Sequence, residues 1–452
     1  MRRIIIFLPV TLLLITACNK KENYKDVIHN PELYSDVVHE LNTVVMGNNF
    51  SPIVASRNYM YASVAAYEVI AAGYPDMYES LAGQLHELNA NSIPRPDTTK
   101  KIDFEMAAII AFSRLGEAVT FPKGSMSYYI DSIKALAKDH GMTESMLKNS
   151  IEYADAVSAV ILDWSKTDLY KETRTYPKYN VRDEPGRWVP TPPAYTPAME
   201  PHWNKIRPLV LDSADQFTPP PPPTYDLNNK KGKYYQEVML IKNAIDSLTK
   251  EQKHIADFWD DNPFKLNVSG HIMFGTKKFS PPGHWMSIAG IAAKKANFDF
   301  PATVYAYALL AITQFDAFIH CWDEKYRSNY ARPETVINKY IDPDWSPYLQ
   351  TPPFPEYTCG HSTVSAANAE ALTYALGDNF AYTDTSELEF GIASRSYKSF
   401  RDAAVENNWA RFYGGIHFHN SCIISTEYGK KVGDFIITKL KMRKKAGHLS
   451  DN

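Results

Sequence analysis

Apolar residues recur along this chain at spacings of three and four positions, which is the pattern of a helix with one buried face. No segment shows a convincing alternation of apolar and polar residues, so the sequence predicts no core strands. We therefore expect an all-α protein built from packed helical bundles. The clearest predicted helices lie at 103–119, 144–164, 234–248 and 302–322.

A proline-rich stretch at 176–224 interrupts this pattern. Proline lacks a backbone donor and clashes with the preceding helical turn, so this stretch is not the interior of a helix. A flexible linker is one interpretation. Aromatic residues are interleaved with the prolines, however, and we favour an ordered, extended connector packed over the bundles. These aromatic residues are Trp188, Tyr195, Trp203 and Phe217.

The connector divides the chain into two helical halves. We expect an N-terminal bundle at 27–170, the connector at 171–229, a C-terminal helical domain at 230–442 and a tail at 443–452. The formal net charge of −3 gives no reason to expect nucleic acid as a partner. Any site for an anionic ligand therefore needs a local cluster of positive charge.

The first 18 residues, MRRIIIFLPVTLLLITAC, read as a signal peptide: two arginines, an apolar run, then small residues before Cys18. The run is too short for a membrane span. Its end resembles a bacterial lipobox, in which the cysteine is lipidated after cleavage; an ordinary signal peptide with a chance cysteine is the alternative. We expect an exported lipoprotein, anchored to a membrane through Cys18 with residues 19–26 as a tether, in the outer membrane or at the periplasmic face.

Three further cysteines follow Cys18, namely Cys321, Cys359 and Cys422. An odd number in an exported protein leaves at least one free thiol or an intermolecular bond. No spacing among them resembles a zinc site or a CxxC motif.

Three short segments of the C-terminal half, KYRSNYARP, TCGHS and ARFYGGIHF, combine positive charge with histidine. Lysine supplies charge, and the planar fork of arginine matches the oxygens of a phosphate-like anion. Glycine lets the backbone come close, and a helix beginning near Ser362 would direct its free N–H groups at the same place. Two histidines can then attack or coordinate the central atom and transfer a proton. The residues are Lys325, Arg332, Gly360, His361, Arg411 and His417.

Together the segments resemble the signature of the superfamily of vanadium-dependent haloperoxidases and type 2 phosphatidic acid phosphatases, whose motifs read K-x6-RP, P-S-G-H and S-R-x5-H. The segments RWVPTPP, FWDDNPF and PPGHW extend the likeness to bacterial haloperoxidase-like proteins along most of the mature chain. The resemblance implies two packed helical bundles of the vanadium haloperoxidase and acid phosphatase type, with the active site in the domain at 230–442.

The resemblance also implies roles for single residues. His361 would be the acid–base residue, and Gly360 would donate its backbone N–H to the oxyanion. His417 would be the axial vanadium ligand of a peroxidase or the phosphorylated nucleophile of a phosphatase. The oxygens of vanadate or phosphate would be held by Lys325, Arg332 and Arg411. Trp322, Asp323 and Phe354 resemble pocket-lining residues of bacterial haloperoxidases, although packing at a helix end is an equal alternative.

Three positions depart from the motifs. Cys359 stands where a serine contacts the oxyanion, and Ala410 replaces the serine before the arginine. Ser421 stands where an aspartate often orients the second histidine; Asn420 or Glu427 could take that part. The surrounding cations and the helix start should lower the pKa of Cys359, yet a thiolate would repel an oxyanion, so we expect a neutral thiol or one turned aside.

Three functions follow. The first is a vanadate-dependent haloperoxidase that oxidises iodide or bromide with hydrogen peroxide. The second is an acid phosphatase without a cofactor that cleaves a phosphate ester through a phosphohistidine. The third is a non-catalytic, oxyanion-binding lipoprotein. Whole-chain likeness favours the first, whereas Cys359 argues against it because peroxide and hypohalous acid oxidise thiols.

A second Gly-His pair, in PPGHW at 281–285, opens another apolar run. His284 has no arginine partner at motif spacing. We interpret it as a structural residue at a helix start that satisfies local backbone groups.

Overall fold

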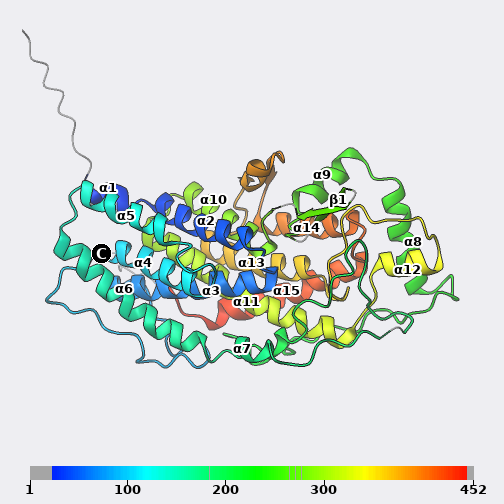
Figure 1. Ribbon diagram of the computed structural model, residues 1–452, viewed down its shortest axis with the longest axis horizontal. Helices are drawn as coiled ribbons and strands as arrows, with labels where there is room; N and C mark the ends of the chain where they lie inside the picture. The colour runs from blue at the N-terminus through cyan, green and yellow to red at the C-terminus, as the bar shows by residue number, and fades with distance from the viewer. Residues whose placement is uncertain (1–22, 183, 264, 270, 276, 445–452) are drawn as a thin grey trace, which may run out of the picture.

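The molecule is elongated and predominantly helical, as predicted (Figure 1). The computed structural model describes residues 23–444 except 183, 264, 270 and 276, so the predicted signal peptide and Cys18 lie outside the described residues. The elements are α1 (Tyr24–Ile28), α2 (Pro31–Gly47), α3 (Pro52–Gly73), α4 (Phe104–Ala118), α5 (Ser127–Asp139), α6 (Glu144–Ser165), α7 (Tyr170–Thr173), η1 (Trp203–Lys205), α8 (Lys233–Asp246), α9 (Lys250–Phe258), β1 (Leu266–Ser269), β2 (Ile272–Gly275), α10 (Pro281–Lys295), α11 (Phe300–Ser328), α12 (Pro333–Tyr340), α13 (Gly360–Leu376), β3 (Tyr382–Asp384), η2 (Ser386–Phe390), β4 (Arg395–Tyr397), α14 (Phe400–Tyr413) and α15 (His419–Lys439).

The four clearest predicted helices are α4, α6, α8 and α11. Their starts follow local chemistry: the side chain of Asp299 accepts a hydrogen bond from the backbone N–H of Ala302 at the start of α11, and Asn329 ends that helix in the left-handed conformation at φ 48°. Residues 24–26, expected as tether, instead lie in α1, because Asn23 caps that helix. Two short antiparallel hairpins, β1–β2 and β3–β4, were not predicted.

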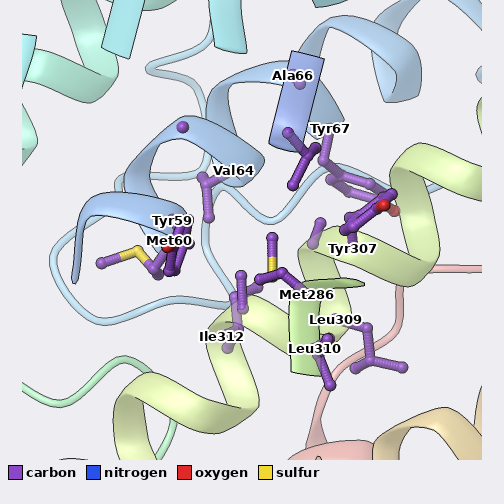
Figure 2. Packing of buried hydrophobic residues seen from close by; sticks show 14 of the residues in the cluster. Tyr59, Met60, Val64, Ala66, Tyr67, Met286, Tyr307, Leu309, Leu310 and Ile312 are labelled. Atoms are coloured by element: carbon purple, nitrogen blue, oxygen red, sulfur yellow. The ribbon is translucent and has the colours of Figure 1, made fainter. Parts of the chain in front are cut away.

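One continuous core joins the two halves of the chain. Figure 2 shows α3, with Tyr59, Val64 and Tyr67, facing Met286 of α10 and Leu310 of α11. In Figure 1 the helices α4, α5 and α6 occupy one end of the molecule, α8 and α12 the other, and α3, α11, α13 and α15 run between them. Within the described part of the chain, α11 alone has the length and hydropathy to cross a bilayer, and its apolar window is buried in this core.

The proline-rich connector is ordered along its described residues and packs over α11. Trp188 and Trp203 are fully buried, and Phe217 packs on Phe435. The backbone N–H groups of 209–211 donate to the carboxylate of Asp316 in α11 at 2.7–2.9 Å. Tyr195 is the exception to the expectation, because its ring is exposed.

Candidate active site

The three charged segments meet in the C-terminal half. Lys325 lies in the last turns of α11, Arg332 precedes α12, His361 lies in the first turn of α13, and Arg411 and His417 flank the end of α14. The side chains of the lysine and both arginines are buried. Burial is costly for a cation unless an anion or hydrogen bonds compensate it, so their partners decide what this cluster is for.

Arg332 links the second and third segments. Its Nε donates to the carbonyl oxygen of Phe354 at 2.9 Å, and its Nη1 donates to the carbonyl oxygen of Ile416 at 2.8 Å. Nη1 also lies 3.0 Å from Nε2 of His417. Burial lowers the pKa of Arg332 to about 10, with Glu356 acting in the opposite direction, so the guanidinium stays charged at neutral pH.

A carboxylate holds His417, and it is not one that the sequence suggested. Nδ1 of His417 lies 2.9 Å from Oε1 of Glu356, which is fully buried. The backbone N–H of Phe418 donates to the same oxygen at 3.1 Å, and the Ser421 hydroxyl donates to Oε2 at 2.9 Å. Nδ1 is therefore the protonated nitrogen, and the lone pair of Nε2 points toward Arg332.

The two alternatives that we considered for this role are wrong. Glu427 pairs with Lys431 on the surface, and Asn420 donates its backbone N–H to Glu237. Ser421 acts indirectly, because its hydroxyl donates to the Glu356 carboxylate that contacts the imidazole of His417.

Lys325 organises the loop before α13. Its Nζ donates to the carbonyl oxygens of Pro355 at 2.9 Å, Glu356 at 3.2 Å and Thr358. The ammonium also lies 4.9 Å from the ring centre of Phe354. Burial lowers the pKa of Lys325 to about 8. Its three donors are thus used by the loop, and the lysine contributes mainly charge to the cluster.

His361 is held differently from His417. Its Nε2 has no hydrogen-bond partner among the described residues and lies 3.9 Å from Oδ2 of Asp261, which is likewise unpartnered there. Burial, followed by the positive charge of Arg411, keeps the pKa of His361 well below its ordinary value. A neutral imidazole that faces a carboxylate can accept and release a proton.

Asp261 is in turn held by a buried cluster of charged residues around His284. Nδ1 of His284 lies 2.9 Å from Oδ1 of Asp261, and Nε2 lies 2.9 Å from Oδ2 of Asp384. Burial alone lowers the pKa of His284, but the two carboxylates raise it well above its ordinary value, so this imidazole is charged. Its ring stacks on Trp259, whose carbonyl oxygen accepts a hydrogen bond from Nη1 of Arg411 at 2.7 Å.

The first turn of α13 brings Cys359 and Gly360 to the cluster. The backbone N–H of Cys359 donates to the Ser425 hydroxyl at 2.8 Å, and its thiol neighbours that of Cys422. Burial raises the pKa of Cys359, but the neighbouring Cys422 thiol and His417 outweigh it and lower the pKa well below its ordinary value. A Cβ on Gly360 would lie 3.4 Å from the ring of Trp322, an ordinary van der Waals contact, so the helix start lies beside that ring.

Two of the three expected pocket residues lie beside the cations. The rings of Trp322 and Phe354 pack with centres 5.0 Å apart, and the guanidinium of Arg332 lies over Phe354 at 5.0 Å. Asp323 forms its hydrogen bonds elsewhere: it accepts from Asn204 at 2.9 Å and from Arg327 at 3.2 Å. It therefore joins α11 to the connector.

The buried polar groups that lack hydrogen-bond partners among the described residues indicate which ligand suits this site. Nη2 of Arg332, Nε of Arg411, Nε2 of His361 and the Ser362 hydroxyl are buried without a hydrogen-bond partner among the described residues. Leaving such a group unpaired costs about 1–3 kcal/mol, and more if it is charged. A tetrahedral oxyanion would accept hydrogen bonds from the two arginines and the Ser362 hydroxyl, and the lone pair of His417 Nε2 could coordinate its central atom. The residues therefore fit vanadate.

Comparisons with known proteins agree with this chemistry. The model of a family described as the second helical-bundle domain of VCPO matches residues 305–445. The crystal structure of the first bacterial vanadium-dependent iodoperoxidase is 45% identical, with a TM-score of 0.86, and covers 92% of this chain and 98% of that chain. A search of curated proteins found no match.

Two more distant structures share the fold. A holo-type bacterial vanadium-dependent chloroperoxidase is 18% identical with a TM-score of 0.63 and covers 88% of this chain and 93% of its own. An apo-type structure of a bacterial vanadium-dependent chloroperoxidase is 18% identical with a TM-score of 0.66 and covers 86% of this chain and 94% of its own.

Proposed function

We propose that this chain, which belongs to the vanadium-dependent haloperoxidase family, oxidises iodide with hydrogen peroxide at the site around His417. Its haloperoxidase function and its vanadate cofactor follow from the family. Iodide as the preferred halide, and the residues that do the work, are our inference. The inference that iodide is the preferred halide rests on the 45% identity to an iodoperoxidase over 92% of this chain.

The unpaired donors support His417 and the two arginines as the holders of vanadate. Arg332 and Arg411 would donate to its oxygens through Nη2 and Nε, and His417 would coordinate the metal through Nε2. Glu356 accepts the hydrogen bond from Nδ1–H and so fixes the tautomer that has its lone pair on Nε2. When bound, vanadate supplies a Lewis-acidic centre that activates hydrogen peroxide for oxygen transfer to a halide.

His361 would move the protons of the reaction. It is neutral, because burial and Arg411 hold its pKa low, so Nε2 can accept a proton from incoming hydrogen peroxide. The same nitrogen returns the proton when water leaves. Asp261, 3.9 Å from Nε2, would stabilise the imidazolium between these two steps. Trp322 and Phe354 shield Lys325 and Arg332 from bulk water, which strengthens the local field.

The two other functions that the motifs allow are not favoured. A phosphatase needs the same cations and a nucleophilic histidine, but the likeness to haloperoxidases covers nearly the whole chain. A non-catalytic oxyanion binder needs the cations but gains nothing from a neutral His361 next to Asp261.

A halide assay tests the proposal. Vanadate-free protein would be supplied with hydrogen peroxide and either iodide or bromide, with and without orthovanadate, and with para-nitrophenyl phosphate in parallel. We expect halide oxidation that requires vanadate and is faster with iodide, and no turnover of the phosphate ester. Faster oxidation of bromide would reject iodide as the preferred halide, and ester turnover that vanadate inhibits would favour a phosphatase.

Matched histidine variants test the site. His417→Ala should lose vanadate binding, followed by vanadium NMR, and all vanadate-dependent oxidation. His419→Ala is the control, because the ring of His419 stacks on Trp409, with ring centres 4.6 Å apart. Equal losses in both variants would mean that His417 is not the ligand.

We further propose that the protein is exported and held at a membrane by a lipid on Cys18, on the strength of the lipobox-like sequence. Metabolic labelling with a radioactive fatty acid should mark the wild-type chain, and Cys18→Ala should remove the label and release the protein from the membrane fraction. Labelling that survives the substitution would reject the proposal.

A further inference from the structure

The cysteines of the described chain are placed unequally around the site. Cys321, Cys359 and Cys422 are all buried and free. The thiols of Cys359 and Cys422 are neighbours, close enough for each to shift the pKa of the other. Cys321 instead contacts Thr358, with its sulfur 3.3 Å from the Thr358 hydroxyl and 3.7 Å from the carbonyl oxygen. Two of the three thiols thus form a pair, and one member of that pair stands directly before Gly360 and His361.

The helices that carry this pair are packed too closely to move apart easily. A Cβ on Gly429 of α15 would lie 2.1 Å from the carbonyl oxygen of Thr363 in α13, and one on Gly433 would lie 2.8 Å from that of Ala367. The hydrogen bond from the Cys359 backbone N–H to the Ser425 hydroxyl, at 2.8 Å, ties the start of α13 to α15 three residues after Cys422. The backbones of α13 and α15 are therefore held together where the two thiols lie.

The reaction itself brings oxidants to these thiols. Hydrogen peroxide is its substrate and hypoiodous acid its product, and both oxidise cysteine. A lone thiol would proceed through sulfenic acid to the irreversible sulfinic and sulfonic acids, whereas a neighbouring thiol intercepts the first product. The pairing therefore changes what happens to Cys359 after the first oxidation.

We propose that Cys359 and Cys422 are a reversible modification site, in which oxidant formed at the active centre converts the two thiols into a disulfide that suppresses the peroxidase. The Cys359 sulfur takes iodine from hypoiodous acid and releases water. The Cys422 sulfur then attacks the Cys359 sulfur and expels iodide, and the second thiol proton goes to solvent. In sum, two thiols and hypoiodous acid give one disulfide, iodide, a proton and water. With hydrogen peroxide, the same two thiols give the disulfide and two waters.

The bond would disturb the site through Cys359. That residue is the N-cap of α13, the position at which related motifs place an oxyanion-contacting serine, and it precedes the acid–base residue by two positions. Because the backbone is fixed, a bond to Cys422 changes the Cys359 side chain: its sulfur turns toward Cys422 and loses the thiol hydrogen that could donate to the oxyanion. A disulfide reductant would restore the thiol and the activity.

In the cell, the oxidant would come from the proposed peroxidase function, so the proposal rests on that function. Direct oxidation of vanadate-free protein tests the disulfide itself without relying on it. The full chain would be treated with hypoiodous acid or hydrogen peroxide, digested without reduction and analysed by mass spectrometry. We expect a cross-linked peptide pair containing Cys359 and Cys422, lighter by two hydrogens than the separate peptides, that disappears on reduction. Oxidation of Cys359 to sulfinic acid without this cross-link, or a bond from Cys359 to Cys321, would overturn the proposal.

Two serine variants separate the pair from the third thiol. Cys422→Ser should abolish the cross-link and send Cys359 to sulfinic and sulfonic acids. Cys321→Ser, the matched control, should leave the cross-link at the wild-type yield. During turnover, wild-type protein and Cys321→Ser should lose activity that dithiothreitol restores, and Cys422→Ser should lose activity that dithiothreitol does not restore. If dithiothreitol restores none of the lost wild-type activity although the cross-link forms, the disulfide is not what suppresses the enzyme.

Discussion

Two helices of the C-terminal half, α10 and α13, each carry a Gly-His pair in their first turn, and the two histidines have opposite surroundings. His284 bonds a carboxylate through each ring nitrogen, both at 2.9 Å, and carries a charge. His361 is neutral, its Nε2 has no hydrogen-bond partner in the described part of the chain, and it faces Asp261 at 3.9 Å. The same dipeptide therefore yields a charged, fully paired imidazolium in one place and a neutral imidazole with an unpaired Nε2, within the described residues, in the other.

Asp261 connects the two regions. One of its oxygens accepts from His284, and the other faces His361. A buried imidazolium whose hydrogen bonds are satisfied holds a neighbour in place, while a buried imidazole with an unpaired nitrogen is free to exchange a proton. Both histidines follow a glycine at a helix start, so the local sequence does not separate them. They differ in whether their ring nitrogens have hydrogen-bond partners in the described part of the chain.

The largest difference should appear when the unpaired histidine is removed. His361→Ala should lower kcat for iodide oxidation by about 10²–10⁴-fold, the usual contribution of a positioned general acid–base residue. Its free energy of unfolding should change little, because the wild-type Nε2 has no hydrogen bond to lose within the described chain. Initial rates and urea unfolding check this; a large loss of stability with kcat retained would reverse the assignment.

Removal of the paired histidine should act on stability instead. His284→Ala leaves Asp261 and Asp384 buried and uncompensated, which should lower the free energy of unfolding by about 3–5 kcal/mol. Urea unfolding of the variant against wild type measures it, and His254→Ala, on the half-buried face of α9, serves as a control. A loss below about 1 kcal/mol, the range of an exposed ion pair, would show that the cluster is not a buried charge pair.

A third histidine sharpens the comparison, because His417 has a carboxylate on one nitrogen only. Glu356→Gln keeps the size of the side chain but removes the charge that fixes the imidazole. We expect a loss of about 10–100-fold in vanadate affinity, as for other partners of metal-binding histidines. Vanadate titration of the two proteins measures this ratio. Glu427→Gln is the matched control and should bind vanadate like wild type, since Glu427 pairs with Lys431 on the surface.

The smallest effect should be a difference in the pH dependence of stability. Because the pKa of His284 is raised on folding, its contribution to the free energy of unfolding is fully present below the unfolded pKa of 6.5. That contribution is lost as pH rises through the folded pKa. The lowered pKa of His361 means that the folded state resists its protonation, so stability falls as pH drops below 6.5. Each slope is at most about 1.4 kcal/mol per pH unit.

Unfolding titrations of wild type, His284→Gln and His361→Gln would resolve the two slopes. Relative to wild type, the first variant should lose the decline in stability above pH 6.5, and the second should lose the decline below it. Slopes of the same sign in both comparisons would contradict the opposite charge states of the two histidines.

Much of the helical fold could be predicted from spacing, because a helix with one buried face leaves a periodic trace in the sequence. The predicted segments at 103–119 and 144–164 differ from α4 and α6 by at most one residue at either end. The hairpins β1–β2 and β3–β4 were missed, since strands of three or four residues are too short to show an alternating pattern. The exposure of Tyr195 was also missed, because interleaved aromatics do not say which of them faces the core.

By itself, the sequence determined the helices, the three charged segments and the family likeness, because each of these is written in residue types at short, regular spacing. Only the tertiary structure decided which charges are satisfied. Glu356 lies 61 positions before His417, Asp261 lies 100 positions before His361, and Cys422 lies 63 positions after Cys359. Hydrogen bonding and desolvation depend on distances between atoms that only chain packing brings together. Those distances make His284 a fixed charge, leave His417 with its lone pair on Nε2, and keep His361 neutral.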